Sequence, residues 1–353
     1  MIDLGLKILK KKDLTIILVS LVFIIAMIIY INPETFINNI KSFDKGYLVL
    51  IMGLIVIDLL LRVTRWWILL QSQEHFIPFR SLMYPSFASN MLNVFLPGRA
   101  GEVVRLYALR DEYNVTYSVG LSVIVVEQVI NMMALVTVSS FALGLIFFSG
   151  ISFNSNIINS LIPYAFMGSL VLIVGLIMLF IVDPNKFIPI FSFLPVSINS
   201  KVVRLIHTFS FGLKNIKTKF YIFWVALSTS LVVWCIEGFV IWLITTQFIN
   251  PNYEFSIAFF ASTIGNLNFL FPILPGAIGT YETTLAVVLS LSTHYEQANA
   301  FLVALTDRFI KTAILIVLGG FSLIHLGSKT LNVLRKQSVE EQKIDQAKEE
   351  FAD

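Results

Sequence analysis

The sequence has 353 residues, of which 57% are hydrophobic and 13% charged, whereas about 25% charged residues are expected of a soluble domain. This composition excludes a soluble globular protein and predicts an all-α polytopic membrane protein. The formal net charge of +3 is too small to indicate a nucleic-acid partner, and the single cysteine, Cys235, excludes a disulfide framework within one chain.

The N-terminal part contains two predicted spans, each close to the roughly 20 residues needed to cross the hydrocarbon. The first, residues 14–31, follows a lysine-rich start, and no small-residue cleavage site comes after it, which indicates an uncleaved span. The second is residues 47–70. Its later part carries basic and tryptophan residues: Arg62, Arg65, Trp66 and Trp67. Because these residue types favour a membrane interface, we expect them there.

The next segment carries a motif. Residues 87–102 read FASNMLNVFLPGRAGE, and their apolar run is short for a span and ends at Pro97-Gly98. Interrupted backbone at membrane depth is tolerated only where protein or a wet cavity surrounds it. The segment therefore predicts a re-entrant or broken helix, followed by a stretch, residues 98–115, in or near the cytoplasm.

The middle of the chain predicts two further spans and a surface segment. Residues 117–148 are long enough for one tilted span, and their polar step consists of Glu127, Gln128 and Asn131. Residues 161–182 carry no charge, which favours a lipid-facing span. Residues 183–219 are rich in lysine and predict an amphipathic connection on the cytoplasmic membrane surface.

The C-terminal part repeats this plan. A span at residues 220–246 carries Trp234, Glu237 and Trp242, which adds two tryptophans expected at an interface and one intramembrane acid. Residues 260–282 read FASTIGNLNFLFPILPGAIGTYE and predict a second broken helix pair within residues 256–292. The last span, residues 299–326, is followed by a charged cytoplasmic tail, residues 327–353.

The two motifs form an internal repeat, which fixes the architecture. Repeat one covers about residues 47–149 and repeat two about 220–326, and three predicted spans lie between the motifs, so the copies enter the membrane from opposite sides. We therefore expect a transmembrane domain over residues 1–326, with six full spans and two broken helix pairs in an inverted repeat. The bias of Lys and Arg predicts that both termini are cytoplasmic in a cell membrane.

Inverted repeats with broken helices are typical of transporters that bind substrate near the midplane. A half-helix that restarts after Pro-Gly presents free N–H groups and suits an anion, although Pro-Gly can also make a simple packing turn. Arg99 and Arg105 provide forked donors for a phosphate. The candidate headgroup site comprises Asn90, Pro97, Gly98, Arg99, Gly101, Glu102, Arg105, Pro275, Gly276, Gly279 and Glu282.

A second set of candidate residues forms an intramembrane charge network: Glu127, Glu237, Asp307, Arg308 and Lys311. Each charge costs about 2.5–3.5 kcal/mol at the bilayer centre, so these groups must pair or line a hydrated cavity. Intrahelical pairing between Asp307 and Lys311, and between Asp58 and Arg62, is the simpler explanation. For Glu102 and Glu282 the simpler explanation is that each acid stabilises the first turn of its own helix.

The motif N-x₆-P-G-R-A-G-E-x-x-R at Asn90–Arg105, with P-G-A-I-G-T-Y-E at Pro275–Glu282, resembles the lysylphosphatidylglycerol synthase transmembrane region family, also called flippase-like integral membrane proteins. The resemblance implies movement of a lipid between leaflets. It does not extend to a soluble aminoacyl-transferase domain. Where the family often has Glu-Arg and a following Asp, this chain has Glu127-Gln128 and Asn131, which predicts a weaker charge network there than at Asp307-Arg308.

The leading hypothesis is a flippase or scramblase, and not an enzyme, for an anionic phospholipid or a polyprenyl-phosphate-linked lipid. The scattered histidines predict no metal site, and the absence of nucleotide and nucleophile motifs predicts no cofactor. Two alternatives stay open. One is a lipid-modifying transferase with Glu102 or Glu282 as general base, and the other is a non-transporting subunit of a partner synthase or glycosyltransferase.

Overall fold

The computed structural model describes residues 41–350 apart from 42, 97–98, 152, 154–155, 192–194, 271–276 and 292–296. The predicted first span, residues 14–31, and the two Pro-Gly steps, Pro97-Gly98 and Pro275-Gly276, lie outside the described residues. Every regular element in the described part is a helix, which confirms the all-α prediction.

Helices α4 (Lys45–Ser72), α5 (Phe79–Phe95), α6 (Glu102–Tyr113) and α7 (Tyr117–Phe148) form the first half of the described chain. Asp44 caps α4 by accepting the N–H groups of Gly46 and Tyr47 at 2.6 and 3.2 Å, which satisfies donors that a helix start leaves free. Helix α6 ends where Asn114 adopts a left-handed conformation, a common way to stop a helix.

The second half repeats this order after a segment of three intervening helices. Helix α8 (Asn156–Ile181), the short 3₁₀ helix η2 (Pro184–Phe191) and α9 (Val196–Thr218) lead to α10 (Phe220–Phe248). Helices α11 (Phe255–Leu270), α12 (Thr280–Leu291) and α13 (Gln297–Glu350) follow. The order of a long helix, two short ones and a long one therefore occurs twice in the described chain.

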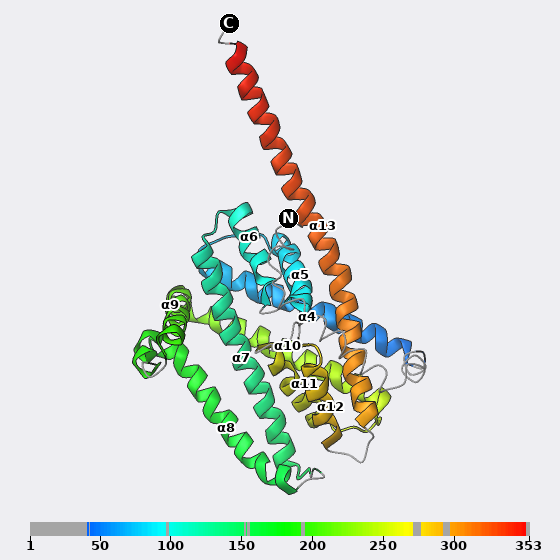
Figure 1. Ribbon diagram of the computed structural model, residues 1–353. Coiled ribbons are helices and arrows are strands. Elements are labelled where there is room, and N and C mark those ends of the chain that lie inside the picture. Colours follow the sequence, from blue (N-terminus) through cyan, green and yellow to red (C-terminus); the bar gives the residue numbers. More distant parts are fainter. Residues whose placement is uncertain are drawn as a thin grey trace.

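Five of the described helices are long and apolar enough to cross a membrane: α4, α7, α8, α10 and residues Asn299–Gly327 of α13. Helix α8 lies at the edge of the bundle against α7, and it leaves most of its apolar side chains exposed (Figure 1). This exposure agrees with the predicted lipid-facing span. Helix α13 does not end at the predicted boundary but continues far beyond the bundle (Figure 1).

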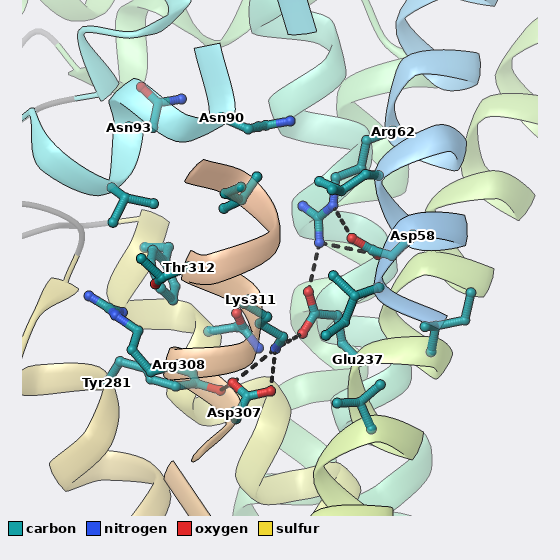
Figure 2. A pocket seen from close by; sticks show the side chains of 18 of the residues that line it. Asp58, Arg62, Asn90, Asn93, Glu237, Tyr281, Asp307, Arg308, Lys311 and Thr312 are labelled. Atoms are coloured by element: carbon teal, nitrogen blue, oxygen red, sulfur yellow. Dashed lines mark hydrogen bonds and ion pairs between the residues drawn. The ribbon is translucent and has the colours of Figure 1, made fainter. Parts of the chain in front are cut away.

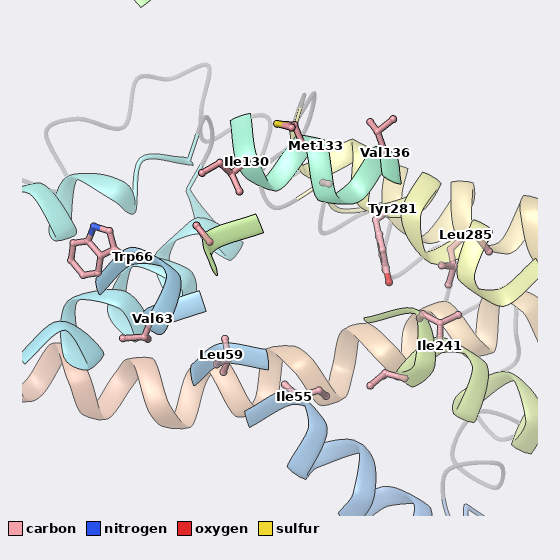
Figure 3. Packing of buried hydrophobic residues seen from close by; sticks show 14 of the residues in the cluster. Ile55, Leu59, Val63, Trp66, Ile130, Met133, Val136, Ile241, Tyr281 and Leu285 are labelled. Atoms are coloured by element: carbon pink, nitrogen blue, oxygen red, sulfur yellow. The ribbon is translucent and has the colours of Figure 1, made fainter. Parts of the chain in front are cut away.

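Helices of the first half pack against helices of the second half. Helix α4 packs against α10, α5 packs against α13, and α11 packs against α7. Apolar side chains of α4, α7, α10 and α12 meet in one cluster (Figure 3), which includes Ile55 and Trp66 of α4, Met133 of α7 and Leu285 of α12. This reciprocal packing is what the predicted inverted repeat requires, and the repeat itself stays a prediction.

The interface positions predicted for two tryptophans are wrong. Trp66 is fully buried, and Trp234 is 4% exposed and donates its indole N–H to the carbonyl of Asn131 at 3.1 Å. Hydropathy distinguishes apolar from polar residues, but it does not distinguish a side chain packed on protein from one in lipid. Trp67 and Trp242 are half-buried, and each donates to the segment after its own helix, at Ile77 and Tyr253.

Candidate functional site

The first motif folds α6 back against α5 through a tight turn. Arg99 has a left-handed φ of 57°, which non-glycine residues rarely adopt. The N–H of Gly101 donates to Oδ1 of Asn93 at 2.9 Å, and a Cβ atom on Gly101 would lie 2.3 Å from the carbonyl oxygen of Ser89. The glycine of this motif therefore permits a backbone approach that no other residue allows.

The second motif makes a matching turn before α12. Ala277 also has a left-handed φ, 53°, and Gly279 follows with 82°. The buried carboxylate of Glu282 accepts the N–H of Gly279 at 2.7 Å, and its other oxygen lies 3.4 Å from Nε of Arg308. Arg99 and Ala277 each follow a Pro-Gly step by one residue. The two turns therefore share their unusual conformation at corresponding positions.

Glu127 organises a buried ion network on the side of the first motif. It accepts from Nη2 of Arg65 at 3.0 Å and from Nη2 of Arg105 at 2.7 Å. Arg105 also pairs with Glu102 at 2.8 Å, and its guanidinium lies 4.0 Å from the ring centre of Trp66. The prediction of a weak network here is wrong, because the arginine partners come from α4 and α6 instead of from α7 itself.

A second network crosses three long helices (Figure 2). Asp58 and Arg62 of α4 pair at 2.7 Å, and Arg62 also reaches Oε1 of Glu237 on α10 at 2.9 Å. The other oxygen of Glu237 accepts from Lys311 on α13, and Lys311 in turn pairs with Asp307 at 2.8 Å. The predicted intrahelical pairs are thus confirmed, and Glu237 joins them into one chain of charges.

This network extends to α12 and lies beside the second motif. The hydroxyl of Tyr281 donates to Asp307 at 2.7 Å. Arg308 pairs with Glu282 and lies 5.6 Å from the ring centre of Phe269. Asp307 is thereby fixed between helices α12 and α13, and Arg308 is held against the turn that Glu282 closes.

A cavity of ≈ 190 Å³ lies between the two halves, with side chains from α4, α5, α10, α11, α12 and α13 on its walls. Asn90, Arg99, Arg62, Glu237, Arg308 and Lys311 line it, together with apolar residues such as Leu59 and Leu315. A smaller polar cavity of ≈ 30 Å³ shares Arg62, Asn90, Arg99 and Asn131 with the larger one and adds Arg65 and Arg105. The two cavities therefore adjoin each other, and the two networks lie on their walls.

Three cations that line the larger cavity are more accessible than the acids behind them. The exposed fraction of the side chain is 36% for Arg99, 25% for Arg62 and 20% for Lys311. The carboxylates behind them, Asp58, Glu237 and Asp307, are 9% exposed or less. An entering group thus meets positive charge first, an arrangement that suits an anion.

The structure brings together the described members of the predicted sites. Asn90, Arg99, Glu102 and Arg105 lie with Glu127 around the smaller cavity, and Glu237, Asp307, Arg308 and Lys311 lie around the larger one. Gly101, Gly279 and Glu282 form the turns instead of the cavity walls. No cluster of metal-ligating side chains occurs among the described residues.

Sequence reasoning missed the site roles of Arg62, Arg65, Asn93 and Tyr281. Arg62 and Arg65 lie about one turn apart on a largely apolar helix, and two arginines inside a predicted span were the available signal. Tyr281 stands next to Glu282 within the second motif. Its role depends on a partner, Asp307, that only the folded chain brings near.

The fold and the site define the class of the protein: a helical membrane protein in which long and short helices surround a charged cavity. The family model of the lysylphosphatidylglycerol synthase transmembrane region matches residues 17–319. The chain therefore belongs to this family.

Three curated proteins are similar to the chain. Glycosyltransferase AglD of Haloferax volcanii is 25% identical over 350 residues, which cover 92% of this chain and 55% of AglD. The UPF0104 membrane proteins MJ1078 and MJ1595 of Methanocaldococcus jannaschii are 26% and 23% identical, over 71% and 90% of this chain and 97% and 96% of their own lengths. The chain spans about half the length of AglD. No solved structure matches it.

Proposed function

We propose that the protein moves an anionic phospholipid or a polyprenyl-phosphate-linked lipid between the leaflets of the cell membrane. The observation that carries this proposal is the cavity between the two halves, where cations are accessible and carboxylates lie behind them. A lipid phosphate enters such a cavity past Arg99, the most exposed of these cations, as a counter-ion of the cavity's positive charges. Its apolar tails stay among the apolar walls and the bilayer.

The orientation belongs to the same proposal. Both termini and the connection at residues 183–219 are cytoplasmic, because Lys and Arg concentrate on that side of the predicted topology. Arg99, at the first turn, and Tyr281, just after the second turn, line the same cavity. The headgroup passes between them.

A second candidate function rests on the similarity to AglD, which is named a glycosyltransferase. In this reading the chain is the membrane part of a system that works on a lipid-linked sugar, with a partner glycosyltransferase or synthase. It predicts that the purified chain alone moves no lipid. Reconstitution of the chain by itself therefore separates the two functions.

The test is leaflet exchange of fluorescent phosphatidylglycerol in proteoliposomes, measured by chemical quenching of the outer leaflet. Arg99→Ala removes one charge-assisted contact worth about 1.5–3 kcal/mol, so exchange should slow by about ten- to hundred-fold. Arg204→Ala, on the exposed face of α9, is the matched control and should exchange as the wild type does. The transport proposal is refuted if leaflet exchange in vesicles with the wild-type protein is no faster than in protein-free vesicles, both for phosphatidylglycerol and for a polyprenyl phosphate.

A further inference from the structure

Glu237 bridges two accessible cations in the second network, as Glu127 bridges two buried cations in the first. Each of the two carboxylate oxygens of Glu237 accepts from a different cation, Oε1 from Arg62 and Oε2 from Lys311. The two cations lie on different helices and line the larger cavity (Figure 2). A carboxylate that bridges two cations has the same two-oxygen geometry that a phosphate presents to them.

The other two acids of this network are tied to their cations within one helix. Asp58 precedes Arg62 by four residues on α4, and Asp307 precedes Lys311 by four residues on α13. Each of these pairs therefore moves as a unit. Glu237 reaches both from α10, so it is the acid that can leave without breaking an intrahelical pair.

The departure of Glu237 from its place between Arg62 and Lys311 changes the charge balance of the second network. Arg62 and Lys311 supply two positive charges, and Asp58, Glu237 and Asp307 supply three negative ones, so the network carries one excess negative charge. A lipid phosphate between Arg62 and Lys311 adds another. An additional buried charge is costly, and the cost disappears if Glu237 takes up one proton as the phosphate arrives.

We propose that Glu237 stands in for the lipid phosphate between Arg62 and Lys311, and that the phosphate displaces it while Glu237 takes up a proton. This inference rests on the proposed function and names the phosphate-holding pair within it. The proton comes from the side on which the lipid enters, and Glu237 releases it to the other side when the phosphate leaves and the carboxylate pairs again with Arg62 and Lys311. One proton then crosses with each lipid monoanion. The transported unit is electroneutral, and a difference in pH across the membrane drives the lipid towards the leaflet on the alkaline side.

The surroundings of Glu237 contain several other charged or titratable groups. From α4 these are Asp58, Arg62 and Arg65, and from α13 Asp307, Arg308 and Lys311. From α12 it is Tyr281, from α7 Glu127, and from the first turn and α6 they are Arg99, Glu102 and Arg105. Helix α11 carries no titratable residue, and α9 joins α10 at Lys219, about five helical turns from Glu237. Glu127 also bridges cations of two helices, but the side chains of Arg65 and Arg105 are only 4% and 8% exposed, against 25% for Arg62 and 20% for Lys311. Glu237 is therefore the bridging carboxylate whose neutralisation frees cations that a headgroup can reach.

The experiment uses the full chain in proteoliposomes with fluorescent phosphatidylglycerol. With equal pH on both sides, wild-type exchange should rise by up to about tenfold for each unit of acidification, since the protonated fraction of an ionised group rises by that factor. With a gradient of one unit, the leaflet ratio should approach about tenfold in favour of the alkaline side. Glu237→Gln, a permanently neutral mimic, should exchange faster than wild type at alkaline pH and lose both dependences, whereas Glu237→Asp should keep them.

A binding measurement gives a readout that does not require transport. In weakly buffered detergent solution, phosphatidylglycerol should make the wild type take up about one proton per protein, and Glu237→Gln none, with Glu254→Gln on an exposed position behaving as wild type. Proton coupling is overturned if wild-type exchange does not depend on the pH gradient, or if Glu237→Gln takes up as many protons as the wild type. Either result leaves the transport proposal standing. Absence of wild-type exchange overturns the transport proposal and this inference with it.

Discussion

The buried network around Glu127 predicts a large loss of stability on Glu127→Ala. Three hydrogen bonds end on this carboxylate: from Nε and Nη2 of Arg65 at 3.3 and 3.0 Å, and from Nη2 of Arg105 at 2.7 Å. All three side chains are buried. The substitution therefore leaves two guanidinium groups without the carboxylate that they share.

The expected magnitude follows from these contacts. At about 1.5–3 kcal/mol for each hydrogen bond to a charged group, the sum is about 4.5–9 kcal/mol, which is an upper bound. Arg105 keeps Glu102 at 2.8 Å, and Arg65 keeps Asn131 and Ser230 at 2.9 Å. We therefore expect about 3–5 kcal/mol, the usual cost of removing one partner of a buried pair.

The assay is the melting temperature of the detergent-solubilised protein, which is measured as the fraction that remains soluble in size-exclusion chromatography after heating. At roughly 2 °C per kcal/mol, Glu127→Ala should lower it by about 6–10 °C. Glu254→Ala at an exposed position is the control, and Arg65→Met with Glu127→Leu should recover part of the loss, since Arg105 then keeps one acid for one charge. A melting temperature for Glu127→Ala within one or two degrees of the control would contradict the assigned role.

Two further predictions concern packing and topology. A Cβ on Gly319 would lie 2.4 Å from Cβ of Met91 and 2.8 Å from the carbonyl oxygen of Phe87, so Gly319→Ala should push α5 away from α13 and lower the stability by about 1–3 kcal/mol. A Cβ on the neighbouring Gly320 meets nothing within 4 Å, so Gly320→Ala should leave the melting temperature almost unchanged. Equal effects of the two substitutions would argue against the α5–α13 contact. In a variant without Cys235, cysteines placed at Asn154 and Gln337 should react with an impermeant thiol reagent from opposite sides of the membrane, and reaction of both from outside would contradict the cytoplasmic termini.

Much of the fold could be predicted because its signals are local. Runs of apolar residues set the long helices, and the spacing of four predicted the pairs of Asp58 with Arg62 and of Asp307 with Lys311. The two motifs correctly marked the short helices on either side of each turn. At Glu102 the local first-turn role and the site role coincide, because it pairs with both Arg99 and Arg105.

The rest of the site depends on partners far apart in the chain. Arg62 meets Glu237 across 175 positions, and Arg65 meets Glu127 across 62, distances over which helical periodicity carries no information. Arg65 and Trp66 were predicted at an interface because their residue types are common there, yet both are buried. Only helix packing distinguishes an arginine that reaches headgroups from one that reaches an acid on another helix.

Helix α13 has a mechanical consequence. It runs from Gln297 to Glu350, and its apolar part ends at Gly327. At about 1.5 Å per residue, the remainder is roughly 35 Å long. It projects beyond the bundle (Figure 1). Lys311 lies on the same continuous rod. A partner that tilts the outer end of α13 therefore also moves Lys311, because no loop separates that end from the contact between Lys311 and Glu237.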